Sequence, residues 1–164
     1  MNSFNYTSKP YLNTNRITSE VATWLSDSYG GYYVTVNSLR VKDTIYFEQQ
    51  IINLVHKLND FCLGRSYQRR EKQLNIVACL EYGKVNGNLH AHLLITYKDA
   101  DIKRSYQEVN AYIGKQWHKT IGQKRIFSDM VNVLEIGDIS SRVSYSVKDT
   151  HFLMRKDFFN VLFL

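Results

Sequence analysis

Apolar side chains recur every three or four residues between positions 45 and 61, which is the spacing of one face of an α-helix. Asp43 precedes this run and can cap the first turn, and Gly64 follows it. The pattern therefore predicts a helix between these two residues. Its apolar positions are Ile45, Phe47, Ile51, Ile52, Leu54, Val55, Leu58 and Phe61.

Four shorter segments are rich in β-branched and aromatic residues, which is typical of strands. The Asn86-Gly87 pair between the second and the third segment indicates a tight hairpin. Two further helices are expected, one before and one after the fourth strand. The strands cover residues 32–37, 74–82, 89–97 and 131–136, and the helices cover residues 103–120 and a shorter stretch from Asp138 or Ser140 to Lys148.

The order of these elements is β-α-β-β-α-β, followed by a helix. This is the order of the split βαβ folds, so we expect an α+β protein with a ferredoxin-like or RRM-like core, a central antiparallel sheet and a C-terminal helix. A chain of 164 residues suits one such domain, which we place at residues 30–164. Because residues 1–20 are polar and irregular in pattern, we expect residues 1–29 to form a loosely docked N-terminal arm.

Two histidines, His90 and His92, stand at alternate positions of the strand at 89–97, so both project from the same face of the sheet. Glu81 ends the preceding strand, and the hairpin folds it back beside them. Two imidazoles and one carboxylate can bind a divalent ion and leave coordination positions open for substrate. The alternative is that the imidazoles face water and bind nothing.

A second candidate feature is Tyr145 with Lys148, which lie one helical turn apart on one face if this segment is helical. A phenol attacks at neutral pH only with help from a cation, a base or a metal-activated electrophile, and Lys148 and the ion can each provide such help. The alternative for Tyr145 is a surface aromatic residue that packs on the sheet.

These motifs, in this order, resemble those of the HUH endonucleases, the family whose members initiate rolling-circle replication. Leu89-His90-Ala91-His92-Leu93-Leu94 resembles the motif of two histidines around a hydrophobic residue, with Glu81 at the acidic ligand position. Tyr145 followed by Lys148 resembles the nucleophile motif of the single-tyrosine class, and residues 32–37 loosely resemble the first-strand motif.

The resemblance implies a metal-dependent, site-specific nickase and strand transferase that acts on single-stranded origin DNA, which a hairpin can present. It implies that Glu81, His90 and His92 bind Mg²⁺ or Mn²⁺, that Tyr145 forms a 5′-phosphotyrosine link, and that Lys148 orients or neutralises the phosphate. The host element would be a plasmid, a phage or a small virus. Two alternatives stay open: a single-tyrosine HUH transposase, and an RRM-like nucleic-acid-binding module without catalysis.

Lys and Arg outnumber Asp and Glu by 21 to 15, which favours phosphate-bearing partners such as DNA. Two basic clusters are candidates for DNA contacts, although each also suits a solvated loop. The first contains Arg65, Tyr67, Arg69, Arg70 and Lys72, and the second contains Lys115, Lys119, Lys124 and Arg125.

Other patterns limit the class of protein. A phosphate-binding GxxxxGK[ST] loop is missing from the sequence, so either a host helicase is recruited or the chain is a fragment. Cys62 and Cys79 lack the spacing of a disulfide framework or a zinc site. Without a signal or membrane-spanning pattern, we expect a soluble intracellular protein without membrane partners, in the cytoplasm of a bacterial or archaeal host or, if viral, in a eukaryotic nucleus.

Overall fold

The computed structural model describes residues 14–26, 30–38, 43–65, 67–70, 72–83, 88–97, 102, 104–122, 131–147, 155–156 and 161–163. Its elements, in chain order, are α1 (Thr14–Ser26), β1 (Gly30–Asn37), α2 (Thr44–Leu63), the short 3₁₀ helix η1 (Gln68–Arg70), β2 (Asn75–Tyr82), β3 (Leu89–Tyr97), α3 (Tyr106–Thr120), β4 (Val131–Glu135), α4 (Ile139–Val147), β5 (Arg155–Lys156) and β6 (Val161–Phe163).

The sheet has the strand order β4-β1-β3-β2-β6-β5. Its first four strands are antiparallel to their neighbours, and β3 lies between β1 and β2. This is the strand order of the split βαβ fold, so the predicted fold class, with an α+β ferredoxin-like or RRM-like core, is confirmed. β6 adds to the edge of β2 in parallel, and β5 pairs with β6.

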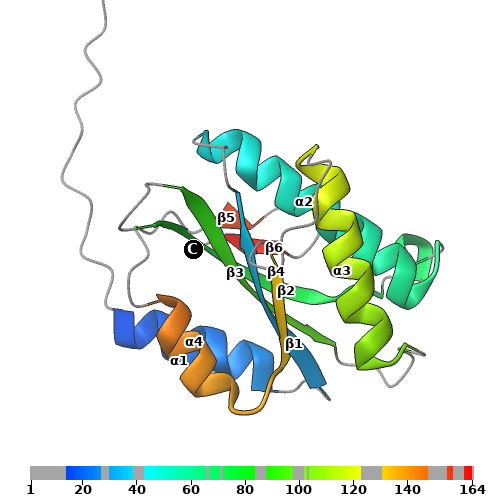
Figure 1. The fold of residues 1–164 in the computed structure, drawn as a ribbon. Coiled ribbons are helices and arrows are strands. Elements are labelled where there is room, and N and C mark those ends of the chain that lie inside the picture. Colours follow the sequence, from blue (N-terminus) through cyan, green and yellow to red (C-terminus); the bar gives the residue numbers. More distant parts are fainter. Residues whose placement is uncertain are drawn as a thin grey trace, which may run out of the picture.

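The helices lie on both faces of the sheet. α2 and α3 cover one face, and α1 and α4 lie side by side on the other (Figure 1). Because side chains alternate along a strand, β3 contributes to both layers. Ala91 and Leu93 are buried in the core under α2 and α3, whereas Leu94 is buried in the smaller core under α1 and α4.

Capping residues define where the helices begin. The Asp43 carboxylate accepts hydrogen bonds from the first turn of α2, at 2.9 Å from the amide nitrogen of Ile45, and Gly64 follows its last turn. Ser105 and Glu108 form a reciprocal capping box at the start of α3. The predicted long helix between Asp43 and Gly64 is thus confirmed.

The N-terminal segment differs from the sequence-based expectation. Residues 14–26, predicted as part of a loosely docked arm, form α1, and its Val21 and Leu25 are buried against Val143 of α4 and Val77 of β2. This part of the segment is therefore a packed helix, because burial of its apolar side chains favours docking. Residues 1–13 and 27–29 lie outside the described part of the chain.

The described helices include none with both the length and the apolar composition needed to cross a bilayer.

Candidate metal centre beside a tyrosine

The register of the β2–β3 hairpin brings an acidic residue and two histidines together. Glu81 lies directly opposite His90, and Cys79 lies opposite His92. Directly paired residues of antiparallel strands project from the same face, and so do residues two positions apart on one strand. Glu81, His90 and His92 therefore share one face of the sheet, as predicted from the hairpin, and this is the face that carries α1 and α4.

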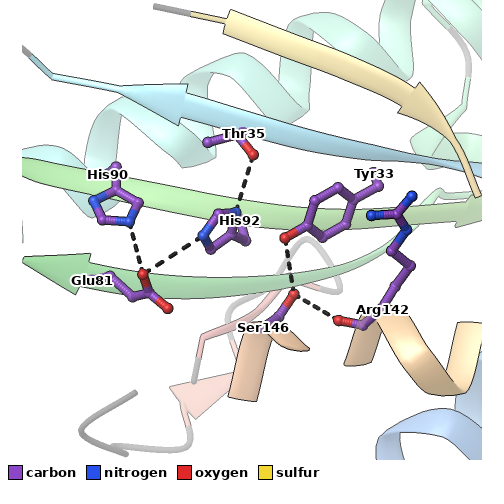
Figure 2. Close-up of polar contacts among 7 residues, drawn as sticks. All are labelled: Tyr33, Thr35, Glu81, His90, His92, Arg142 and Ser146. Atoms are coloured by element: carbon purple, nitrogen blue, oxygen red, sulfur yellow. Dashed lines mark hydrogen bonds and ion pairs between the residues drawn. The ribbon is translucent and has the colours of Figure 1, made fainter. Parts of the chain in front are cut away.

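Their side-chain atoms converge on one point. Glu81 Oε2 lies 2.7 Å from His90 Nε2 and 3.6 Å from His92 Nε2 (Figure 2). The potential ligand atoms of all three residues lie within 4.8 Å of one another, so this group can hold a metal ion. Two imidazole nitrogens and a carboxylate oxygen suit several divalent ions, and the arrangement alone selects none of them.

His92 is the more enclosed of the two imidazoles, with a side chain that is 10% exposed against 21% for His90. Burial lowers the pKa of His92, and this effect exceeds the opposing influence of the Glu81 carboxylate. A lowered pKa favours the neutral imidazole, which is the form that binds metal ions. The surroundings of the ring therefore favour the protonation state that a ligand requires.

A threonine on β1 contacts the other nitrogen of this ring. Thr35 is the register partner of His92, and its Oγ1 lies 3.1 Å from His92 Nδ1. Nε2 consequently faces Glu81, while Nδ1, on the opposite side of the ring, contacts the Thr35 hydroxyl (Figure 2). Contacts of this type, from a residue that is not itself a ligand, orient metal-binding histidines in many proteins.

Tyr145 lies beside the same histidine. Its ring centre is 5.8 Å from that of His92 in an edge-on arrangement, and the residue is 62% exposed. α4 docks through Val143 and Ser146, which are both fully buried. Because these two residues face the sheet, Tyr145 lies at the border of the helix, next to the metal candidate but open to solvent.

A second tyrosine near His92 has the opposite environment. Tyr33 is 5% exposed, and its ring stacks on that of His92 with 5.6 Å between centres. Its hydroxyl lies 3.5 Å from Ser146 Oγ, which donates a hydrogen bond to the carbonyl oxygen of Arg142 at 2.9 Å. Burial raises the pKa of Tyr33, so it is a worse candidate for a nucleophile than Tyr145.

Arg142 contributes a positive charge to this end of α4. Its guanidinium carbon lies 5.0 Å from the centre of the Tyr33 ring, a cation–π distance. Figure 2 shows Tyr33 between His92 and this guanidinium. The charge therefore lies beside Tyr33, on the side away from Glu81.

The first predicted DNA-binding cluster lies far from the metal candidate. Arg65 and Arg69 follow the C-terminal end of α2, whereas Thr44, the first residue of this helix, hydrogen-bonds Tyr82, the neighbour of Glu81. A helix of 20 residues spans about 30 Å, so the two ends are well separated. Arg70 ends η1, and Lys72 is half-buried just before β2.

Tyr67 does not fit the role predicted for it. It is 2% exposed, and its hydroxyl lies 2.8 Å from His56 Nδ1 and accepts a hydrogen bond from Gln68 at 3.2 Å. A ring in this position has no exposed face on which a base can stack, so this prediction needs correction. The clue that was missed is the position of Tyr67 four residues after the last residue of the long helix, where an aromatic residue can fold back onto this helix.

The second basic cluster is only partly described. Lys115 and Lys119 are exposed on α3, which packs with Val109, Ile113 and Trp117 against the opposite face of the sheet from the metal candidate. Lys124 and Arg125 lie outside the described residues, as does Lys148, the predicted partner of Tyr145. The structure thus unites Glu81, His90, His92 and Tyr145, and it does not bring the described residues of the two predicted basic clusters to them.

Sequence reasoning missed Thr35, Tyr33 and Arg142. The signal for Thr35 and Tyr33 is their alternation along β1, but it becomes useful only once β1 is known to pair with β3. Arg142 precedes Tyr145 by one helical turn, and this spacing was available from the sequence.

Comparison with known proteins identifies no related sequence or structure. No protein-family model matches the chain, and searches of curated proteins and of solved structures find no significant match.

Proposed function

We propose that the chain is a metal-dependent nickase and strand transferase for single-stranded DNA that works through a 5′-phosphotyrosine link at Tyr145 and initiates rolling-circle replication. The observation that carries this proposal is the position of Tyr145, whose exposed ring lies against a histidine of a group that can hold a metal ion. The candidate nucleophile, Tyr145, and the candidate metal ligand His92 are more than fifty residues apart in the sequence, yet their rings are neighbours in the fold.

In the proposed reaction, the Tyr145 hydroxyl oxygen attacks the scissile phosphorus, and the bond from phosphorus to the 3′ oxygen breaks. The tyrosine loses its proton, and the departing oxygen gains one to become a free 3′-hydroxyl. An ion held by Glu81, His90 and His92, which we take to be Mg²⁺ or Mn²⁺, would polarise the phosphate oxygens. Attack by the 3′-hydroxyl reverses the step and rejoins the strand.

Burial of the two aromatic residues of β1, Tyr32 and Tyr33, favours this reading over a non-catalytic RRM-like module. Modules of that type bind single strands by stacking bases on exposed aromatic residues of the sheet. Tyr32 and Tyr33 of β1 are each 5% exposed, Tyr32 within the core under α2 and α3 and Tyr33 beside α4. Neither ring offers a stacking surface.

The test uses single-stranded oligonucleotides from the genetic element that encodes the chain, incubated with the protein and Mn²⁺ and separated on a denaturing gel. We expect a slow band that resists SDS, requires the metal and disappears in Tyr145→Phe. Tyr46→Phe is the matched control, because Tyr46 is also an exposed tyrosine but lies on α2, across the sheet. A band that persists in Tyr145→Phe and disappears in Tyr33→Phe would move the nucleophile to Tyr33.

A further inference from the structure

We propose that Thr35 is a positioning residue that holds the His92 ring in the orientation in which its Nε2 can bind a metal ion. This inference rests on the metal role proposed above for Glu81, His90 and His92. It assigns a chemical task to a residue of β1, the strand that loosely resembles the first-strand motif of the family.

The contact is set by the backbone. Thr35 and His92 are register partners on the adjacent strands β1 and β3, and the Thr35 hydroxyl oxygen lies 3.1 Å from His92 Nδ1. Paired side chains on these strands project from the same face, so the hydroxyl meets the ring without any movement of the chain. On the far side of the ring, Nε2 lies 3.6 Å from Glu81 Oε2.

The hydroxyl can select the correct ring position. A flip of the imidazole about its Cβ–Cγ bond would replace Nδ1 by a carbon beside Thr35, and Nε2 by a carbon toward Glu81. Such a flip breaks the hydrogen bond to Thr35, so this bond stabilises the orientation that presents nitrogen to the ion. When Nδ1–H donates a hydrogen bond to the Thr35 oxygen, the Nε2 lone pair is free for a metal.

Aromatic contacts alone do not make this selection. Tyr33 stacks on the His92 ring at 5.6 Å between centres, and Tyr145 meets it edge-on at 5.8 Å. Both contacts hold the plane of the ring, but a flipped ring occupies almost the same plane and volume. Among the described contacts of the Nδ1 side, the Thr35 hydroxyl is the one that distinguishes the two positions.

The experiment compares three variants of the full chain. Thr35→Val keeps the shape of the side chain and removes the hydroxyl, whereas Thr35→Ser keeps the hydroxyl. Thr96→Val is the matched control. Thr96 is also a buried threonine and projects from the same face of β3 as His92, but its hydroxyl has no hydrogen-bond partner among the described residues. Mn²⁺ affinity is measured by calorimetry, and the d–d absorption of bound Co²⁺ is recorded at saturation.

We expect Thr35→Val to weaken Mn²⁺ binding by about 10- to 100-fold, the usual loss when a partner of a metal-binding histidine is removed. The Co²⁺ spectrum should also change at saturation, which a mere loss of stability would not produce. Thr35→Ser should restore both properties, and Thr96→Val should leave both as in the parent.

Two results would overturn the inference. Parental Mn²⁺ affinity and an unchanged Co²⁺ spectrum in Thr35→Val would show that the hydroxyl does not position the ring, even if the parent still forms the tyrosine–DNA adduct. A parent protein that binds neither ion would remove the metal role, and this inference with it. The two proposals can also fail separately. If Thr35→Val binds Mn²⁺ more weakly than the parent but the parent forms no tyrosine–DNA adduct, the inference is supported and the nickase proposal is contradicted.

Discussion

The two faces of the sheet are built from the same strands but differ in what they bury. The face under α2 and α3 is closed by a continuous apolar core that includes Leu93, Phe47 and Trp117. The face under α1 and α4 has a smaller core, and its other part carries Glu81, His90 and His92. One face therefore supplies most of the burial that stabilises the fold, and the other keeps polar groups accessible where a helix ends beside them.

The largest effect on stability should come from the closed face. Leu93 is fully buried in the large core, so Leu93→Ala should lower the free energy of unfolding by about 2 to 5 kcal/mol. Urea titration followed by circular dichroism measures this loss. A loss below about 1 kcal/mol would mean that the two faces do not differ in the way described.

His90, three residues earlier on the same strand and on its other face, should behave in the opposite manner. His90→Ala removes a half-buried side chain, so its effect on unfolding should stay below about 1 kcal/mol, within the range of mutations outside the core. Mn²⁺ affinity should fall by more than about 100-fold, beyond the loss seen for partners of metal ligands. Calorimetric titration with Mn²⁺ tests this, and an unchanged affinity would exclude His90 as a ligand.

A smaller effect of opposite sign is expected at Thr96. Its hydroxyl is buried without a hydrogen-bond partner among the described residues, and valine has the same shape. Thr96→Val should therefore raise the free energy of unfolding by about 1 kcal/mol, since an unsatisfied polar group costs about 1 to 3 kcal/mol. A shift of the urea midpoint to lower concentration would indicate that the hydroxyl has a partner after all.

The smallest effect concerns the start of α4, the helix that positions Tyr145. The Asp138 side chain accepts hydrogen bonds from the Ser141 hydroxyl and from the amides of Ser140 and Ser141, and these bonds lower the pKa of Asp138 below its usual 3.8. A carboxylate with a lowered folded-state pKa stabilises the fold above its unfolded-state value, and this contribution disappears as pH falls through the lowered value.

Asp138→Asn should accordingly unfold with a shallower pH dependence than the parent below about pH 4, where the free carboxyl titrates. The free energy of unfolding of both proteins is measured by urea titration at several pH values in this range. The two plots of free energy against pH are then compared. Parallel curves would show that the Asp138 carboxylate has the same pKa in the folded and unfolded chain.

Much of the metal candidate could be predicted from the sequence, because it depends on short-range rules. The two-residue period of a strand aligns His90 with His92, and the antiparallel pairing of β2 with β3 brings Glu81 opposite His90. The Asn86-Gly87 turn predicted between these strands lies outside the described residues. The long helix and the antiparallel core follow from local patterns in the same way. The proximity of Tyr145 to the ion was suggested by the help that a phenol needs to attack at neutral pH and by the family resemblance, and the structure places its ring beside that of His92.

The remaining features depend on long-range packing that the local pattern does not contain. Thr35 becomes relevant only because β1 pairs with β3 across 57 residues of chain. α1 was missed because its segment carries several threonines and serines, which are weak helix formers, and its helix depends on burial of Val21 and Leu25 against α4. Tyr67 was misjudged because its hydrogen bond to His56 joins two segments.

The central claim is that Tyr145 becomes covalently linked to DNA beside the metal candidate. The most direct measurement is peptide mapping by mass spectrometry of the SDS-resistant product, after nuclease digestion leaves a short 5′-phosphonucleotide on the modified residue. The account predicts that the added mass lies on Tyr145 and that it is missing from reactions without Mn²⁺. A nucleotide mass on any other residue, or a metal-independent product, would contradict it.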